Sequence, residues 1–103
     1  MKKKKLDLIS PGEILLEEFL LPLGISQNQL AHDLDVPVSR VAGIIKGDRA
    51  IIADTALRLS QYFGTTADMW MNMQIRYDLK LATRTTWPKI KPRIRTYKAA
   101  SSA

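Results

Sequence analysis

The chain has 103 residues, with 16 Lys and Arg against 10 Asp and Glu and a formal net charge of +6. This length fits one small domain with a modest core. The absence of cysteine excludes disulfides and thiolate metal sites, and it favours a reducing cytoplasm as the setting. No apolar run approaches the roughly 20 residues that a membrane span needs, and the N-terminal lysines are not followed by the apolar segment of a secretion signal.

The basic charge is concentrated at the two ends of the chain. Residues 1–5 include four lysines and residues 83–103 include six Lys or Arg and no acid, whereas residues 6–82 have a net charge of −4. We therefore predict a basic N-terminal tail (1–9), a helical domain (10–82) and a basic C-terminal tail (83–103). The N-terminal lysines are either a solvated tail or an arm that contacts phosphates. Because the middle is acidic, a nucleic-acid interface must be argued from individual side chains.

The first predicted helix begins at residues 10–13, Ser-Pro-Gly-Glu, which form a capping box with proline at the first helical position. Apolar residues recur at helical spacing to about Leu21, and we expect Pro22 and Gly24 to end the helix. Its acidic side chains form either a solvated face or a surface for a basic protein partner.

Residues 27–46 predict a helix-turn-helix. They read QNQLAHDLDVPVSRVAGIIK, in which two apolar stripes of helical spacing are separated by a break at Asp35 and Val36. Ser26 would cap the first helix, Pro37 would open the second, and Gly47 would end it. The outward face of the second helix has no acid and could enter a major groove; it consists of Val38, Ser39, Arg40, Gly43 and Lys46.

Two more helices are predicted after the motif. One spans roughly residues 54–63 and ends at Gly64. The other begins after Thr66, with Asp68 in its first turn, and presents one apolar stripe that we expect to be core: Trp70, Met73, Tyr77 and Leu81. Apolar residues off this stripe suggest a dimer surface: Met69, Ile75 and Leu79.

The periodicity ends at Thr83. Beyond it, basic residues alternate with apolar ones and two prolines interrupt the pattern. We expect an irregular basic tail ending in Ala99 to Ala103, with a strand added to the edge of a partner's sheet as the alternative.

The sequence predicts no enzyme, no metal site and no cofactor. His32 is the only histidine, and without cysteine or a second histidine it makes no metal site. A small ribonuclease is disfavoured because the chain has no paired histidines, no Gly-rich phosphate loop, and no nucleophile with a base at motif spacing.

A series of short motifs resembles the HigA family of antitoxins, also known as virulence-associated protein I, within the lambda-repressor-like group. The resemblance covers about residues 10–82. The motifs are Pro11-Gly12-Glu13-Ile14-Leu15, Val36-Pro37 with Arg40, Gly47-Asp48-Arg49-Ala50-Ile51, Thr55-Ala56-Leu57-Arg58-Leu59, Gly64-Thr65, Trp70 with Gln74, and Tyr77-Asp78-Leu79. It implies an all-α, five-helix lambda-repressor-like domain that dimerises and binds double-stranded operator DNA overlapping its own promoter. It also implies a partner, a small RelE-like ribonuclease toxin (HigB) that the antitoxin neutralises by direct contact.

The sequence departs from the family pattern at two positions. Ile52 stands where the family usually has a Thr that caps the fourth helix, and losing such a cap costs about 1 kcal/mol. Asp54, near the positive end of that helix, should offset part of this loss. Asp35 stands where the motif's turn favours Gly, although Asp tolerates left-handed geometry better than most residues.

In repressor-like docking, the N-termini of both motif helices approach DNA. Gln27 is expected to bond a phosphate together with free backbone N–H groups. Arg40 is the candidate for a bidentate contact to guanine O6 and N7, worth about 1–3 kcal/mol of discrimination. The competing interpretation pairs Arg40 with Asp35 or Asp33. Arg58, on a helix that should face away from the groove, is expected to pair with an acid.

The remaining candidate residues have supporting roles at the DNA. Val38 could touch a thymine methyl group beside Ser39, and Gly43 would allow close approach of the backbone. Lys46 and Arg49 are assigned to phosphates where the helix leaves the groove.

Apart from the disfavoured enzyme, three functions are open. The leading one is an antitoxin and autorepressor. The second is a stand-alone repressor without a toxin partner. The third is a protein-interaction module that has lost DNA binding, for which the acidic middle of the chain is the argument.

Overall fold

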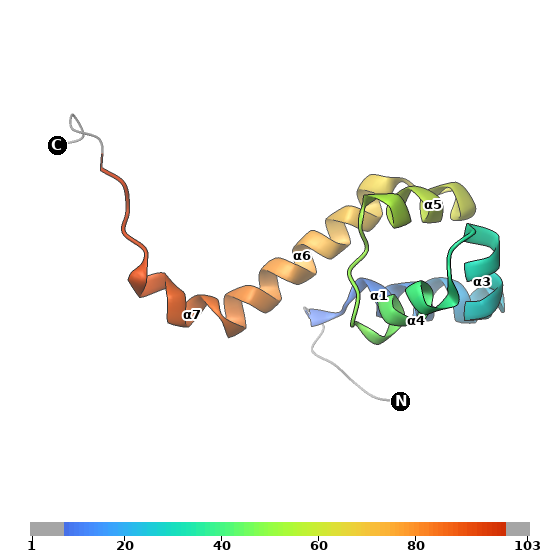
Figure 1. Cartoon of the computed structure of the whole chain (residues 1–103), viewed down its shortest axis with the longest axis horizontal. Helices are drawn as coiled ribbons and strands as arrows, with labels where there is room; N and C mark the ends of the chain where they lie inside the picture. Colours follow the sequence, from blue (N-terminus) through green and yellow to red (C-terminus); the bar gives the residue numbers. More distant parts are fainter. Residues whose placement is uncertain (1–7, 99–103) are drawn as a thin grey trace.

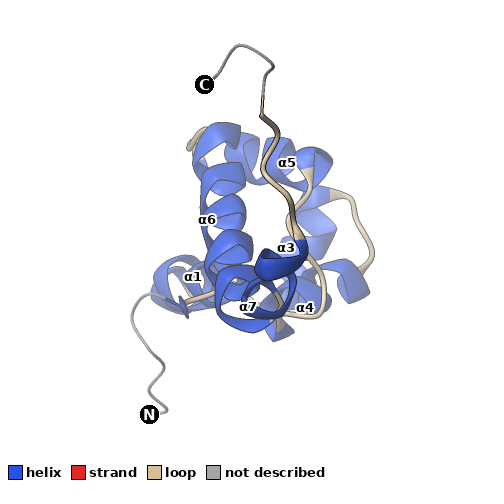
Figure 2. Cartoon of the chain, turned by 90° about the vertical axis from the view of Figure 1, so that its left-hand side faces the viewer, coloured by secondary structure: helices blue, strands red, loops and turns tan. Residues whose placement is uncertain are grey.

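The structure is a computed structural model that describes residues 8–98, and within that range it contains helices and loops but no strand (Figures 1 and 2). This confirms the all-α prediction. The predictions for Lys2 to Lys5 and for Ala99 to Ala103 fall outside the described residues. Within those residues no helix is both long and apolar enough to cross a membrane. The elements are α1 (Pro11–Ile14), η2 (Leu15–Leu20), α2 (Leu21–Leu23), α3 (Gln27–Leu34), α4 (Val38–Lys46), α5 (Ala53–Phe63), α6 (Ala67–Thr85), α7 (Trp87–Ile90) and η3 (Lys91–Arg93).

The segments α1, η2 and α2 follow one another without a break and form one continuous helix. The predicted capping box is present: the Ser10 hydroxyl accepts from the Glu13 N–H, and the Glu13 carboxylate accepts from the Ser10 N–H, both at 3.2 Å. Pro22 does not end the helix, contrary to the prediction. Residues 15–20 form a π-helix, whose wider turns accommodate a proline that an α-helix would reject. The helix ends at Gly24, the second predicted stop, whose φ of 67° is left-handed.

The core is formed around Trp70, which is completely buried. Its Nε1 donates to the Thr65 hydroxyl at 2.8 Å. Its ring lies 5.1 Å from that of Phe19 and 6.3 Å from that of Phe63, within the range of favourable aromatic pairs. The other core residues are Leu15, Leu20, Leu30, Ala31, Leu34, Val41, Ile44, Ile51, Ala56 and Leu59.

The first helix and α4 meet backbone to backbone at Gly12. A Cβ at this position would collide with the carbonyl oxygen of Ile44 and with the Cα of Ile45. Only glycine therefore fits, and the position of α4 is fixed against α1 by main-chain atoms.

The second half of α6 leaves the helical body (Figure 1). Trp70 and Gln74 are buried, whereas Ile75 and Leu79 are 50% and 63% exposed. The predicted apolar stripe is therefore core only at its beginning: Met73 and Tyr77 are half-buried and Leu81 is exposed. The expectation of a continuous core stripe was therefore wrong at Leu81, which is 36% exposed.

The chain stays helical well past residue 83. The α6 helix continues to Thr85, and α7 and η3 follow after a turn at Thr86; of the described residues beyond η3, residues 94–98 lack regular structure. The expected irregular tail from Thr83 was therefore wrong as far as Arg93. Pro88 and Pro92 do not prevent this, because each lies in the first turn of its helix, where a missing N–H breaks no helical hydrogen bond.

Candidate nucleic-acid interface

The helices α3 and α4 form the predicted helix-turn-helix. The Ser26 hydroxyl accepts from the Gln29 N–H at 3.0 Å and caps α3. Asp35 ends α3 with a φ of 60°, the only left-handed residue other than glycine among those described. Pro37 is the extended N-cap of α4, so the helix begins at Val38, one residue later than predicted. Gly47 ends α4 with a φ of 87°.

The two faces of α4 follow the prediction. Val41 and Ile44 are buried against the body. On the opposite face Val38, Ser39 and Lys46 are exposed, and the side chain of Arg40 retains 28% of its accessible surface.

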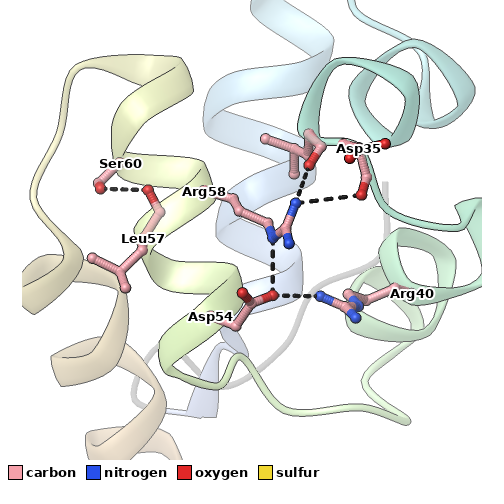
Figure 3. A network of polar contacts seen from close by, with 7 residues as sticks. Asp35, Arg40, Asp54, Leu57, Arg58 and Ser60 are labelled. Atoms are coloured by element: carbon pink, nitrogen blue, oxygen red, sulfur yellow. Dashed lines mark hydrogen bonds and ion pairs between the residues drawn. The ribbon is translucent and has the colours of Figure 1, made fainter.

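Arg40 is paired with an acid that the sequence analysis did not consider. Its Nη1 donates to Asp54 Oδ2 at 2.8 Å, across from α4 to the first turn of α5. The predicted partners were Asp35 and Asp33. Neither is used, because the fold brings the start of α5 beside the start of α4 (Figure 3). Local spacing gave no signal for this pair, since its members are 14 residues apart.

Arg58 also binds Asp54, as predicted for a pairing with an acid. Its Nε donates to the same oxygen, Oδ2, at 2.9 Å. Its Nη1 donates to the carbonyl oxygens of Leu34 at 2.7 Å and Asp35 at 3.3 Å, at the end of α3. The hydrogen bond from Arg58, followed by that from Arg40, lowers the pKa of Asp54 below its usual value. The carboxylate is therefore ionised at neutral pH.

Asp33 belongs to a different hydrogen-bond network from that of Asp54. Gln29 Nε2 donates to its Oδ1 at 2.9 Å, and the Tyr62 hydroxyl donates to its Oδ2 at 2.7 Å. These two hydrogen bonds lower the pKa of Asp33. His32 lies beside it with an 86% exposed side chain. Among residues 8–98 no cluster of His, Cys, Asp or Glu could hold a metal ion.

Gly43 in α4 lies against Arg49 of the same chain. A Cβ there would lie 3.2 Å from the Cβ of Arg49, and the Arg49 N–H donates to the Gly43 carbonyl at 3.1 Å. The side chain of Arg49 thus covers Gly43, where close approach of the backbone to DNA was expected. Arg49 and Lys46 are exposed, and Gln27 is half-buried at the first position of α3.

A cavity of about 210 Å³ lies between Arg40, Arg49 and the start of α5. It is lined by Arg40, Arg49, Ala50, Ile52 and Thr55. Ile52 is the N-cap of α5, is 57% exposed and makes no side-chain cap. The Thr55 hydroxyl is buried and has no hydrogen-bond partner among the described residues. The sequence pattern predicted that Ile52 leaves α5 without a side-chain cap, but it gave no sign of the unsatisfied Thr55 hydroxyl.

Known proteins match both the sequence and this arrangement. A helix-turn-helix family model (HTH_3) matches residues 16–70. Virulence-associated protein I of Dichelobacter nodosus is 52% identical over 80 residues, which are 78% of this chain and 74% of that protein.

Two solved structures extend the likeness to the fold. An addiction module antidote protein of the HigA family from Coxiella burnetii superposes with a TM-score of 0.80 at 46% identity, covering 89% of this chain and 100% of that one. The Pseudomonas aeruginosa antitoxin HigA, solved with the higBA promoter, superposes with a TM-score of 0.82 at 41% identity, covering 88% of this chain and 99% of that one.

Proposed function

The chain belongs to the helix-turn-helix family, together with virulence-associated protein I and the HigA antitoxins, and on this premise we propose that it is a DNA-binding antitoxin that represses its own operon. One observation supports this above all: a relative with the same fold over 88% of the chain was solved with promoter DNA. The exposed face of α4 is the surface that such binding requires. On this proposal the protein acts in the cytoplasm, where operator DNA lies, and has no enzyme activity.

In the proposed complex α4 lies in the major groove. Arg40 reads a guanine through its fork of N–H donors, and Val38 contacts a thymine methyl group beside Ser39. Gln27 at the start of α3 and the exposed Lys46 and Arg49 bind phosphates. Arg49 fits this role well, because its contact with Gly43 orients it beside the end of α4.

The proposed active form is a homodimer. Residues 6–82 have a net charge of −4, so one domain should bind a half-site weakly. A two-fold dimer doubles the contacts and implies half-sites about one helical turn of DNA apart. The projecting part of α6 exposes apolar side chains that a second copy would cover: Ile75, Leu79 and Leu81.

Light scattering tests the dimer. The wild-type chain should have twice the monomer mass at micromolar concentration, and Leu79→Glu should shift it towards monomer. Lys80→Glu, on the next exposed residue of α6, controls for added negative charge and should leave the mass unchanged. A wild-type chain that is monomeric throughout would refute the dimer.

The proposed toxin partner is a small RelE-like ribonuclease. It is supported by the similarity of this chain to HigA antitoxins. Co-expression with the product of an adjacent reading frame tests it: a stable complex and relief of growth arrest are expected. Operator binding without any such complex would favour the stand-alone repressor.

A mobility shift on the upstream promoter region tests DNA binding. Arg40→Ala should abolish most of the preference for the promoter over a scrambled duplex while non-specific binding persists. Lys46→Ala should weaken binding to both duplexes alike and reduce the salt dependence by about one phosphate contact. Equal binding of promoter and scrambled DNA by the wild-type chain would refute operator recognition.

A further inference from the structure

We propose that Asp54 is a positioning residue for base recognition: it holds the Arg40 guanidinium in the orientation that meets the operator, and Arg58 in turn holds Asp54. The inference rests on the proposed function, because it concerns how Arg40 meets DNA. Asp54 contacts no base in this arrangement. It acts through Arg40 alone.

The first step is the fixed contact between α4 and α5. Arg40 Nη1 donates to Asp54 Oδ2 at 2.8 Å, and among the described residues this is the only acceptor for the guanidinium. A guanidinium has five N–H donors in a rigid fork, so one bond to Asp54 leaves the others for a base edge. A long side chain that is already held loses less conformational freedom when it contacts a partner.

The second step is the anchor behind Asp54. Arg58 donates through Nε to the same oxygen that Arg40 uses, at 2.9 Å, and through Nη1 to the Leu34 carbonyl at 2.7 Å. The Leu34 carbonyl belongs to the last turn of α3, where carbonyls have no partner within the helix and attract a cation. Figure 3 shows the resulting chain of contacts from the end of α3, through Arg58 and Asp54, to Arg40.

The third step concerns the alternative, a salt bridge that only stabilises the fold. The Asp54 side chain is 51% exposed, and exposed ion pairs add little to stability. A carboxylate beside a DNA-binding helix also repels phosphates and so weakens binding to any sequence. Orientation of Arg40 offsets that repulsion only at the operator, and the contribution of Asp54 should therefore appear as specificity.

The experiment compares Asp54→Asn with the wild-type full-length chain. Dissociation constants are measured for the promoter fragment, for a scrambled duplex, and for promoters with single base-pair changes. The base pair that Arg40→Ala no longer discriminates identifies the contact of Arg40. Asp54→Asn should lower discrimination at that same base pair by about threefold to tenfold. Non-specific binding should be unchanged or tighter, and Asp54→Asn should add no loss when combined with Arg40→Ala.

A matched control is available on α6. Asp68 occupies the second position of its helix after an alanine, as Asp54 does on α5, and it is also exposed. Asp68→Asn removes the same charge from the same kind of helix start and should leave discrimination unchanged. Arg58→Lys provides a second route, because it keeps the positive charge but loses the fork that binds Asp54 and α3 at once. It should lower discrimination at the same base pair, by less than Asp54→Asn, with melting temperatures recorded for every variant.

Two results would overturn the inference. If Asp54→Asn tightens binding to the promoter and the scrambled duplex equally, Asp54 only repels phosphates. If it raises the preference for the promoter, Asp54 withholds Arg40 from DNA. Failure of the proposed function looks different, because Arg40→Ala would then keep the wild-type preference or the wild-type chain would show none.

Discussion

The first and second halves of α6 both contain apolar residues but bury them to different extents. In the first half Trp70 is completely buried between the first helix and α5, with Phe19 and Phe63 against its ring. In the second half, which leaves the helical body (Figure 1), Leu79 is 63% exposed. An apolar stripe therefore shows which side of a helix favours burial. Whether that side is buried within one chain depends on which other helices pack against it.

The largest expected difference in stability is between substitutions of the two tryptophans, Trp70 in the first half of α6 and Trp87 in α7, beyond its second half. Trp70→Ala removes a fully buried ring and its hydrogen bond to Thr65, and it should lower the free energy of unfolding by about 3–5 kcal/mol. Trp87→Ala, in α7, removes a ring that is 41% exposed and should cost less than about 1 kcal/mol in a monomer. Urea unfolding at low protein concentration measures both changes. Equal losses would mean that the region after residue 74 is part of the core.

An intermediate effect is expected at Gln74, where the two halves meet. Its Oε1 accepts from the Ile51 N–H at 2.8 Å, and its Nε2 donates to Asp78 at 2.9 Å, with the side chain buried. Gln74→Leu would leave the buried Ile51 N–H without a partner and should cost about 1–3 kcal/mol. Thermal unfolding measures it. Gln74→Glu is the control, because it keeps an acceptor for Ile51 but faces Asp78 with like charge.

The smallest effect is expected at the helix starts, where α5 and α6 also differ. Thr66 caps α6 by accepting from the Met69 N–H at 3.1 Å, whereas Ile52 at the same position of α5 makes no cap. Ile52 is exposed, so its replacement leaves no cavity. Ile52→Thr should raise the free energy of unfolding by about 0.5–1 kcal/mol and the melting temperature by a few degrees. Ile52→Ala separates capping from the loss of an exposed apolar side chain, and it should give no gain.

Helix ends were predictable from the sequence because their causes are local. Ser26, Thr66 and Gly64 act within three or four residues of where they stand, and each has the predicted role. The exposed face of α4 was predictable in the same way, because helical spacing separates Val38, Ser39 and Lys46 from the buried Val41 and Ile44. Where contacts come from distant residues, sequence reasoning failed. Asp54 meets Arg40, 14 residues away in the chain, because the fold brings the starts of α4 and α5 together. The helix through Pro22 was missed for a local reason, because the apolar spacing gave no sign of the π-helix at residues 15–20.

The contact at Gly12 has a consequence for how such proteins can diversify. Since α4 rests on the first helix through main-chain atoms, its depth in the body does not depend on which side chains line its outer surface. If α4 reads DNA as proposed, Val38, Ser39 and Arg40 could be replaced together to change the DNA preference while the contact between α4 and the first helix stays the same.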